Sequence, residues 1–590
     1  MSRFLAFFWA MLLCFSWKTA SSQISLDNTF EDWGNIQMVA SEIPGDGFAQ
    51  IGLTHNDDWL FVRLDLEEPV ALDETIISHG TLMLIDVDDD SATGVDYAEQ
   101  GLGVDILVDF PDRQVIRYTG GTGIESLNDL GLNIAPTYSA EKFELAIRRT
   151  DADLVNSDAC RIMMYNTETQ SGFPVGGIAV DFTPSVTPSF ATPLEPHPSA
   201  LLRVGFWNLN GRIGNAEAES AMAAMLAATH PDILGLSEVS NTSANAVRNK
   251  LNQWLPLPDG NEWHVVKDDW DLMVASQFPI VETHASVHRQ FPVLIDVESL
   301  LGARMLFVSS HLKCCGGPNN EAQRQAEADE FMGFLRDGLN GDQSWPNPLP
   351  LVYGGDLNMV GLSNPIHTLV SGDIHDETTF GPDFVPDADG TDFTEWPIVQ
   401  SDHPMDYTWE NPESEWLPGK LDYIITSDAS LDVVRSFVLN TAEMDGLRLD
   451  AYGLDAGTTL QASDHSLVIA DLSAGVVVVE PADSDEDGVP DSLDNCMNIA
   501  NANQNDFNNN GTGDACEDSD GDGLSDALEI TTYGTDPTMV DTDENGVPDG
   551  LELCLCGPGS GDPCFGDLNS DNAVSVADLL IFLGVFGQPC

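Results

Sequence analysis

Acid and amide side chains follow short apolar runs at several places between residues 201 and 475. The run that begins at Leu351 ends in two glycines and then presents Asp356 and Asn358. Because alternate residues of an extended segment point to the same face, both side chains are predicted to share one face at a strand end. A carboxylate can hold a metal ion or a proton, whereas a carboxamide can only orient a ligand through hydrogen bonds. The alternative is a surface turn, since Gly-Gly-Asp-Leu-Asn is also a favourable turn sequence.

Five other strand-like runs in the same region carry a polar group at one end. These groups are Asn208 with Asn210, then Glu238, His311, Asp422, and the pair Asp464 and His465. In this order and spacing, the six segments resemble the endonuclease/exonuclease/phosphatase superfamily, which includes deoxyribonuclease I, AP endonucleases, neutral sphingomyelinases and inositol polyphosphate 5-phosphatases. The resemblance covers residues 201–475. It implies an α/β sandwich, in which two mixed sheets pack together and helices flank them.

The resemblance implies that Glu238 is the principal metal ligand of a phosphoesterase. Hydrolysis of a phosphate ester requires a neutralised phosphoryl charge, an activated water and a stabilised leaving oxygen. Magnesium usually binds one or two carboxylates and keeps several waters. Asn208, Asn210 and Asp464 are expected near the ion, which would be Mg²⁺ or Mn²⁺. Some relatives carry aspartate at the position of Asn210, so the ion is expected to be held less tightly here, or shifted toward Asp464.

The same resemblance assigns five other side chains to the substrate and the water. His465 would face the scissile phosphate, and Asp422 would pair with it, fixing its tautomer and raising its pKa. His311 would hydrogen-bond the phosphate or act as a general acid. Asn358 would hold a phosphoryl oxygen, and Asp356 would orient or deprotonate the water. Either Asp356 or His465 could be the general base.

The segment that follows His311 contains a predicted helix and two further basic side chains. Asn320 and Gln323 have the spacing of a capping box, which predicts a helix from there through Arg336. Lys313 and Arg324 would contact the substrate phosphate or have a capping or surface role.

The first 22 residues have the pattern of a signal peptide. Arg3 precedes an apolar run from Phe4 to Trp17, which is too short to span a bilayer, and Ala20-Ser-Ser fits a cleavage site. The net charge of −75 argues against non-specific nucleic-acid binding and suits calcium binding by an exported protein. We therefore expect an extracellular protein, secreted or attached to the cell surface.

Residues 24–182 alternate short apolar runs with Gly, Asn and Asp turns and show no long helical period. This pattern predicts an all-β sandwich. The segments that begin at Phe30, Asp57 and Ile85 resemble family 9-type carbohydrate-binding modules, so a polysaccharide is the ligand expected for this domain. Its acidic segment would either ligate calcium or form a hairpin turn, and the expected ligands are Asp86, Asp88 and Asp90. Residues 183–200, rich in Pro and Thr, are predicted to form an extended linker.

Residues 483–552 contain a repeated acidic loop in which side-chain oxygens recur at every second position before a glycine and a later acid. This is the pattern of a calcium loop. The expected ligands are Asp483, Asp485, Asp487 and Asp491; Asp518, Asp520, Asp522 and Asp526; and Asp541, Asp543, Asn545 and Asp549. With Cys496 and Cys516 after acidic loops, the copies resemble thrombospondin type 3 repeats. Cysteines of an exported chain favour disulfides. The alternative is a disordered acidic tail.

Residues 564–590 resemble one calcium loop of a dockerin, followed by an apolar helix. The expected ligands are Asp567, Asn569, Asp571, Ser575 and Asp578. A dockerin has two such repeats, and Asn572 replaces the usual glycine here. We therefore expect a small calcium-stabilised module rather than a cohesin-binding one.

Taken together, the sequence predicts a secreted, metal-dependent phosphoesterase with calcium-binding accessory modules. The alternative is a non-enzymatic adhesion or matrix protein that uses the central domain as a scaffold. The substrate would be a nucleic acid, a phospholipid or a small ester. An acidic insertion, residues 373–415, disfavours long polyanions because its charge repels phosphates. The aromatic residues expected at the substrate are Trp396, Tyr407, Trp409 and the adjoining Trp416.

Overall fold

The computed structural model describes most of the chain between residues 24 and 550. The described residues are 24–475, except 42, 44, 73–79, 119–122 and 184–189, and 485–550, except 486, 488, 490–492, 509 and 545. The chain divides into two compact units, and the boundary falls between Val477 and Val478. The signal peptide predicted at 1–22 and the dockerin-like module predicted at 564–590 lie outside the described residues.

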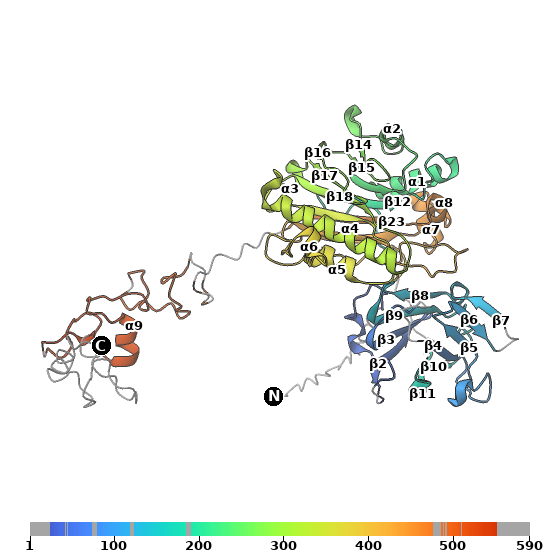
Figure 1. Cartoon of the computed structure of the whole chain (residues 1–590), viewed down its shortest axis with the longest axis horizontal. Helices are drawn as coiled ribbons and strands as arrows, with labels where there is room; N and C mark the ends of the chain where they lie inside the picture. The colour runs from blue at the N-terminus through green and yellow to red at the C-terminus, as the bar shows by residue number, and fades with distance from the viewer. Residues whose placement is uncertain are drawn as a thin grey trace, which may run out of the picture. The chain divides into compact units, whose positions relative to one another are not determined.

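The N-terminal part of the first unit consists of antiparallel sheets, which confirms the predicted all-β domain (Figure 1). One sheet has the order β1-β2-β3-β9-β8 and the other β11-β10-β4-β5-β6-β7. The strands are β1 Met38–Ala40, β2 Phe48–His55, β3 Trp59–Val70, β4 Thr81–Asp86, β5 Ile106–Asp109, β6 Gln114–Arg117, β7 Gly123–Ser126, β8 Leu132–Ala135, β9 Ala140–Arg148, β10 Ala159–Asn166 and β11 Ser171–Asp181; the short 3₁₀ helices are η1 Asp32–Asn35, η2 Tyr97–Glu99 and η3 Leu127–Leu130. Leu60, Val62 and Leu64 alternate along β3 into a core shared by both sheets, because every second side chain of a strand points to the same face.

The central domain contains two six-stranded mixed sheets with helices outside, as predicted. The first has the order β14-β15-β13-β12-β23-β22 and the second β16-β17-β18-β19-β21-β20. The strands are β12 Leu202–Asn208, β13 Ile233–Ser237, β14 His264–Lys267, β15 Met273–Ser276, β16 Ile280–Thr283, β17 Gln290–Ile295, β18 Met305–His311, β19 Leu351–Asp356, β20 Thr394–Glu395, β21 Asp422–Thr426, β22 Leu431–Leu439 and β23 Leu467–Ala474. Phe206 and Phe307 stack between the two sheets, with ring centroids 4.9 Å apart.

Helices cover the outer faces of both sheets in the central domain. They are α1 Ala216–Thr229, α2 Ala244–Trp254, α3 Glu298–Leu301, α4 Pro318–Asp337, α5 Asn364–Ser371, α6 Glu377–Phe380, α7 Gly446–Tyr452 and α8 Thr458–Ala462, with η4 Pro258–Gly260 and the π-helical turn η5 Gly338–Asp342. Met222 and Met225 of α1 pack against Trp207 of the first sheet. Phe331 of α4 packs against Tyr353 of the second, with ring centroids 4.9 Å apart, and α4 crosses the front of this domain in Figure 1.

The helix predicted to start with a capping box at Asn320 begins earlier, at Pro318. The residue before the helix is Gly317, and it makes no side-chain cap. Proline is favourable at the first helical position because its missing N–H would be unpaired there anyway. Asn320 instead donates its amide to the carbonyl of Gly316. The capping-box prediction was therefore wrong, although the helix itself is present.

The second half of the predicted linker packs against the central domain instead of forming a free spacer. Leu194 is fully buried in the core beneath α1. Its carbonyl accepts a hydrogen bond from the guanidinium of Arg203, which also forms a buried ion pair with Asp471 at 2.6 Å. An apolar side chain in a Pro-rich segment can therefore anchor that segment when a neighbouring domain offers a pocket.

The β-domain and the central domain share a hydrophobic cluster. Leu26 and Trp59 of the β-domain pack with Met405 and Tyr407 of the acidic insertion. A parallel bridge pairs Leu26 with Met405, and the Leu26 N–H donates to the carbonyl of Pro404 at 2.8 Å. The insertion that was predicted to face substrate is thus partly an interdomain element.

The second unit has little regular secondary structure among its described residues. Its helical turns are α9 Asp526–Leu528 and the adjoining η6 Glu529–Tyr533. Hydrogen bonds within acidic loops make up much of its order, as at Asp526, whose carboxylate accepts from the backbone and hydroxyl of Ser519.

No helix among the described residues is long and apolar enough to cross a membrane.

Candidate active site

The central strands of both sheets end at the same edge of the central domain. β12 pairs in parallel with β13, and β18 pairs in parallel with β19, so their carboxyl ends lie together. Register places His311 opposite Asp356, and Asp356 opposite Asp422. A cavity of ≈ 320 Å³ opens at this edge. Of the predicted site residues, those that line it are Asn210, Glu238, His311, Asp356, Asn358, Asp464 and His465.

Asp356 lies at the centre of the site and is almost fully buried. Its Oδ2 accepts a hydrogen bond from the Asn208 amide at 3.0 Å, and its Oδ1 accepts from the Asn358 N–H at 3.0 Å. The Nε2 atoms of His311 and His465 each lie 3.6 Å from Oδ2. Burial raises the pKa of Asp356, while the two histidines lower it.

His465 is held between two carboxylates. Its Nδ1 lies 2.8 Å from Oδ2 of Asp422, which is fully buried and also accepts a hydrogen bond from the Thr408 hydroxyl at 2.7 Å. Burial alone would lower the pKa of His465, but the negative charges of Asp422 and Asp356 outweigh it and raise that pKa to about 10. At neutral pH the imidazole is therefore a cation that directs its Nε2 donor toward Asp356 and the cavity.

His311 has its own carboxylate partner, which sequence reasoning missed. Its Nδ1 lies 2.9 Å from Oδ2 of Asp271, so a second His–Asp pair faces Asp356 across the site. Thr408, which orients Asp422, was missed as well. Asp271 lies two residues before β15, so an acid close to the start of a strand was the available signal. Thr408 carried no signal, since it lies inside the acidic insertion.

The proposed metal ligands occupy the side of the cavity next to Asp356. The Glu238 side chain is 38% exposed, and its Oε1 accepts from the Asn208 amide at 3.1 Å. Asp464 accepts from the Asn210 amide at 2.7 Å and from the Trp409 indole at 3.3 Å. Glu238 and Asp464 both line the cavity, and the partly exposed Glu238 leaves room for water, which matches the preference of Mg²⁺ and Mn²⁺ for few protein oxygens.

Asn208 orients the carboxylates rather than the cavity contents. Its Oδ1 accepts the N–H of Asn210 at 2.9 Å, which leaves its amide group to bond both Glu238 and Asp356. The side chain is buried behind these residues. The geometry therefore favours an orienting role for Asn208 over direct contact with an ion.

Three residues of the site adopt left-handed backbone conformations. The φ angles are 45° at Asn210, 57° at Glu238 and 50° at Asn358. Such conformations cost about 1 kcal/mol each outside glycine and persist only where surrounding contacts hold them. Here the Asn208 and Asp356 side chains accept the N–H groups of Asn210 and Asn358. These bends aim side chains that a regular strand would direct elsewhere.

Two basic residues near the site contact protein rather than the cavity. Arg324 is fully buried and donates to the carbonyls of Lys313, Cys315 and Val360. It therefore ties the loop after β18 to the loop after β19 and is not available to a phosphate. Lys313 donates its N–H to Glu327 and places its Nζ 3.8 Å from the sulfur of Cys314.

Only two of the four predicted aromatic residues reach the cavity, namely Trp409 and Trp416. Trp396 packs at the edge of the intersheet core, where its indole donates to the Thr426 hydroxyl at 2.8 Å. Tyr407 is buried in the interdomain cluster. Their substrate-side placement was wrong because the acidic insertion folds onto the β-domain as well as over the site.

Among the residues of the second unit that the structure describes, acidic clusters occur at three places. They are Asp485 with Asp487 and Asp494; Asp518 with Asp520 and Asp522; and Asp522 with Glu529 and Asp549. Asp494 and Glu529 were not expected from the repeat pattern. Asp526 instead accepts hydrogen bonds from Ser519, and the Asp541 carboxylate accepts from the Gly546 N–H. Asp543 belongs to none of these clusters, and Asp483, Asp491 and Asn545 lie outside the described residues.

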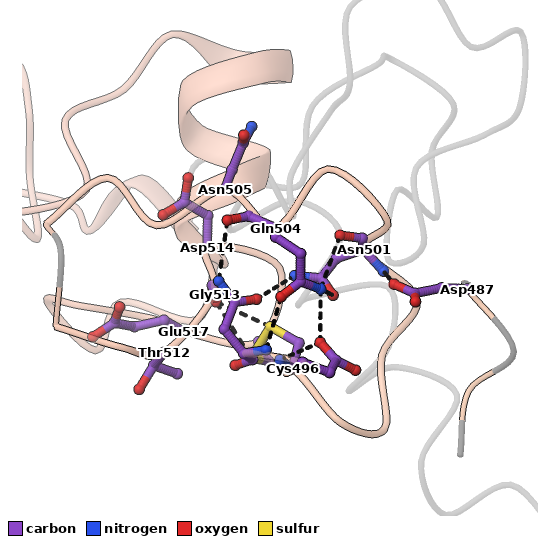
Figure 2. Close-up of a disulfide and its surroundings, with 12 residues drawn as sticks. Asp487, Cys496, Asn501, Gln504, Asn505, Thr512, Gly513, Asp514 and Glu517 are labelled. Carbon is purple, nitrogen blue, oxygen red and sulfur yellow. Dashed lines mark hydrogen bonds between the residues drawn. A yellow bond between two sulfur atoms is a disulfide. The ribbon is translucent and has the colours of Figure 1, made fainter. Parts of the chain in front are cut away.

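A disulfide joins Cys496 to Cys516, 20 residues apart, and spans the segment between the first acidic cluster and the second. Figure 2 shows Asn501 and Gln504 beside it, and Asp487 reaching toward Asn501, whose N–H it accepts at 2.6 Å. Closing a loop of this length stabilises the folded state by ~3 kcal/mol, chiefly by restricting the unfolded chain.

In the β-domain, Asp86 and Asp88 lie together as predicted, but their third neighbour is Asp105 rather than Asp90. The N–H of Asp90 donates to Asp86 and Asp88, and its own carboxylate accepts from the Ala92 N–H. Asp90 thus shapes the hairpin turn, while Asp105 lies directly before β5, the strand paired with β4.

Family comparisons identify the class of the central domain and of the repeats. Residues 205–465 match the Endonuclease/Exonuclease/phosphatase family. Residues 481–504 match the thrombospondin type 3 repeat, and residues 518–539 match the bacterial TSP3 repeat. The central domain is therefore an endonuclease/exonuclease/phosphatase-family domain, and the C-terminal unit carries thrombospondin type 3 repeats. Among curated proteins, none matches the chain in sequence.

Several solved structures are similar to the central domain at low identity. Humanized TDP2 of D. rerio is 12% identical over 46% of this chain and 98% of its own, with a TM-score of 0.30. ANGEL2, a 2′,3′-cyclic phosphatase, is 12% identical over 46% and 94%, with a TM-score of 0.31. An endonuclease/exonuclease/phosphatase from Beutenbergia cavernae is 19% identical over 46% and 72%, with a TM-score of 0.29. Likeness at this level supports no inference about substrate.

Proposed function

We propose that this protein is a secreted, divalent-metal-dependent phosphoesterase that hydrolyses phosphodiester or phosphomonoester bonds. One observation carries the proposal. Two histidines, each backed by a carboxylate, flank buried Asp356 and face one cavity with partly exposed Glu238. A scaffold without catalytic function has no need of two His–Asp pairs that converge on a third carboxylate.

Each proposed step has a side chain in position. A divalent ion held by Glu238, with Asp464 nearby, would neutralise phosphoryl charge. His465, favoured as a cation by two neighbouring carboxylates, is suited to donate a proton from Nε2 to a phosphoryl or leaving oxygen. Asp356 is then the group that accepts the proton of the attacking water. His311 would hydrogen-bond the phosphate from the opposite side of Asp356.

Asn358 completes the proposed site. Its backbone N–H orients Asp356, and its side-chain amide donates to the carbonyl of Leu312 at 3.2 Å. The side chain also lines the cavity, where it would contact a phosphoryl oxygen. This double attachment fixes its position, so the contact costs little ordering on substrate binding.

The test is hydrolysis of bis-p-nitrophenyl phosphate by the full-length protein with Mg²⁺, with Mn²⁺ and with EDTA. Activity that appears with either ion and disappears in EDTA supports the proposal. No hydrolysis with either ion by folded protein would favour the adhesion or matrix alternative.

We further propose a small ester or a lipid headgroup as the substrate, with nucleic acid as the second candidate. The cavity is small, is walled by Trp409 and Trp416, and belongs to a chain of net charge −75. A groove for a duplex needs Lys and Arg along the phosphate track. Plasmid DNA, sphingomyelin and small diesters should be compared at low and high salt. Cleavage of DNA in preference to the others at low salt would replace this assignment with a nuclease.

Export and polysaccharide binding are further parts of the proposal. Thrombospondin type 3 repeats are typical of extracellular proteins, and a signal peptide at residues 1–22 would direct export. N-terminal sequencing of the mature protein should begin at Gln23.

Binding of the β-domain to polysaccharide rests on sequence resemblance alone, and a pull-down of the full-length protein on insoluble polysaccharides tests it.

A further inference from the structure

The β-domain contributes directly to the wall of the candidate active site. Thr137, in the turn between β8 and β9, lines the same cavity as Asp356 and His465. β8 is an edge strand of its sheet, and the turn that follows it contacts the central domain through the Thr137 hydroxyl. A domain that was expected to be a separate accessory module thus reaches the residues proposed for catalysis.

The Thr137 hydroxyl joins the two segments that carry the site. Its Oγ1 donates to the Met359 carbonyl at 2.7 Å and lies 3.2 Å from the Lys420 carbonyl. Met359 follows Asn358 directly, and Lys420 lies two residues before Asp422. One hydroxyl proton is therefore shared between the loop after β19 and the start of β21.

The backbone around this contact leaves little room for change. A Cβ on Gly419 would lie 2.6 Å from the Thr137 methyl group, so the turn and the loop are in close contact. Next to it, Tyr138 forms a parallel bridge with Gly361, and its hydroxyl accepts from the Asn28 side chain at 3.1 Å. The turn is thus fixed on both sides of Thr137.

A second set of contacts from the β-domain holds the aromatic wall of the cavity. The Arg113 guanidinium lies 3.9 Å from the centroid of the Trp416 ring. Asn128 donates its amide to the carbonyls of Ser414 at 2.9 Å and Trp416 at 3.1 Å. Leu417, the next residue, is buried in the β-domain's own core. These contacts fix one end of the loop whose other end, Trp409, bonds Asp464.

We propose that the β-domain is a structural part of the active site. Thr137 is a positioning residue that sets Asn358 and Asp422 relative to each other, and Asn128 with Arg113 holds the Trp416 wall against the substrate. The inference rests on the proposed phosphoesterase function for its kinetic readout, whereas loop mobility can be measured without activity. Misplacement of a reacting group by about 1 Å can cost on the order of a hundredfold in rate, so one shared hydroxyl can matter.

The test of Thr137 uses matched variants of the full-length protein. Thr137→Val keeps the shape but removes the hydroxyl, and we expect kcat to fall about tenfold with KM nearly unchanged. Thr137→Ser keeps the hydroxyl and should stay within about twofold of wild type. Thr169→Val is the control, because Thr169 is an exposed residue of the β10–β11 turn whose hydroxyl bonds only Ser171 among the described residues.

The test of the wall uses Asn128→Asp, which replaces the amide donor with an acceptor opposite two carbonyls. We expect KM for a small diester to rise about fivefold, with kcat changed less than twofold, because Asn128 touches only the wall. Equal kinetics for Thr137→Val, Asn128→Asp and wild type would overturn the proposal.

Hydrogen exchange separates failure of this inference from failure of the proposed function. Amides of 357–361 and 419–422 should exchange faster in Thr137→Val, and those of 414–417 faster in Asn128→Asp, while Thr169→Val matches wild type. These changes are expected even if the protein hydrolyses no phosphoester. Unchanged exchange in both variants would show that the β-domain does not position these loops, whatever the activity.

Discussion

The central domain and the C-terminal repeats hold their carboxylates in different ways. In the central domain, buried Asp356 accepts hydrogen bonds from Asn208 and Asn358, and buried Asp471 is paired with Arg203 and Arg435. In the repeats, Asp518, Asp520 and Asp522 accept backbone N–H groups, but their carboxylates also cluster with one another and have no basic partner in the cluster. We therefore expect the central domain to fold through its own contacts, and the repeats to need a cation that offsets repulsion between like charges.

Because of this difference, loss of metal should affect the candidate active site and the repeats differently. Removing a divalent ion from the candidate active site would leave Glu238 partly exposed and already hydrogen-bonded, so the fold should persist. Removing calcium from the repeats would leave several carboxylates without compensation, and few buried apolar residues are present there to offset the loss. One chelator should thus inactivate one region and unfold the other.

The largest expected effect is on activity. Glu238→Gln, Asp356→Asn and His465→Ala should each lower kcat/KM on the order of a hundredfold or more, because each removes a different contribution to the transition state. Hydrolysis of bis-p-nitrophenyl phosphate measures this, with circular dichroism to establish that each variant is folded. Rates close to wild type in all three would end the assignment of this site.

Substitutions in the two His–Asp pairs can show which histidine is the principal donor. Asp422→Asn should cost more than Asp271→Asn, since Asp422 is fully buried and its charge holds His465 as a cation, whereas Asp271 is partly exposed. We expect about a hundredfold and about tenfold losses in kcat respectively. The same assay compares them, and the reverse order would make His311, not His465, the principal donor.

Calcium removal should destabilise the repeats and leave the central domain folded. In EDTA, hydrogen exchange of residues 485–550 should become fast, while the strands of residues 202–474 stay protected. Adding back calcium, but not sodium at equal ionic strength, should restore protection. Protected repeats in EDTA would mean that protein contacts, not cations, hold their carboxylates.

The disulfide offers a smaller perturbation of the same unit. Cys496→Ser with Cys516→Ser should lower the free energy of unfolding of the repeats by ~3 kcal/mol, since it removes the loop constraint. The consequence to measure is a rise in the calcium concentration needed for half-maximal protection in hydrogen exchange. The first unit is the internal control, because its described cysteines, Cys160, Cys314 and Cys315, are free thiols.

The smallest effect concerns acid sensitivity where the two domains of the first unit meet. Burial lowers the pKa of His403 to about 4, although Glu443 and Asp58 oppose this and Arg148 adds to it. In the unfolded chain the His403 ring binds a proton near pH 6.5. Above that pH the ring is neutral in both states, so its burial does not lower the stability of the fold. The free energy of unfolding therefore falls as the pH drops from 6.5 toward 4, by up to ~1.4 kcal/mol per pH unit.

His403→Phe is the matched variant, because it keeps a ring against Trp59, whose centroid lies 5.0 Å away, and removes the titration. Thermal unfolding at pH 7 and pH 5 should show a larger loss of Tm in wild type than in the variant. Equal losses would show that other groups account for the acid sensitivity.

Much of the candidate site followed from local pattern. Asp356 and Asn358 were placed at a strand end by alternation, and the structure puts both at one cavity with Glu238 and His465. Their catalytic roles remain predictions. The acidic repeats were readable because oxygen ligands at every second residue leave a periodic trace in the sequence. Asp494 and Glu529 were not predicted, because they lie outside that period.

What the sequence determined by itself was the position of each polar group at a strand end and the acidic loops, since each depends on residues close together in the chain. Only the tertiary structure decided that Asp271 pairs with His311, that Thr408 orients Asp422, and that Thr137 enters the cavity from another domain. The physical reason is the same in each case. These contacts join segments that are far apart in the sequence and depend on how the acidic insertion and the β-domain pack, which no local pattern of residues records.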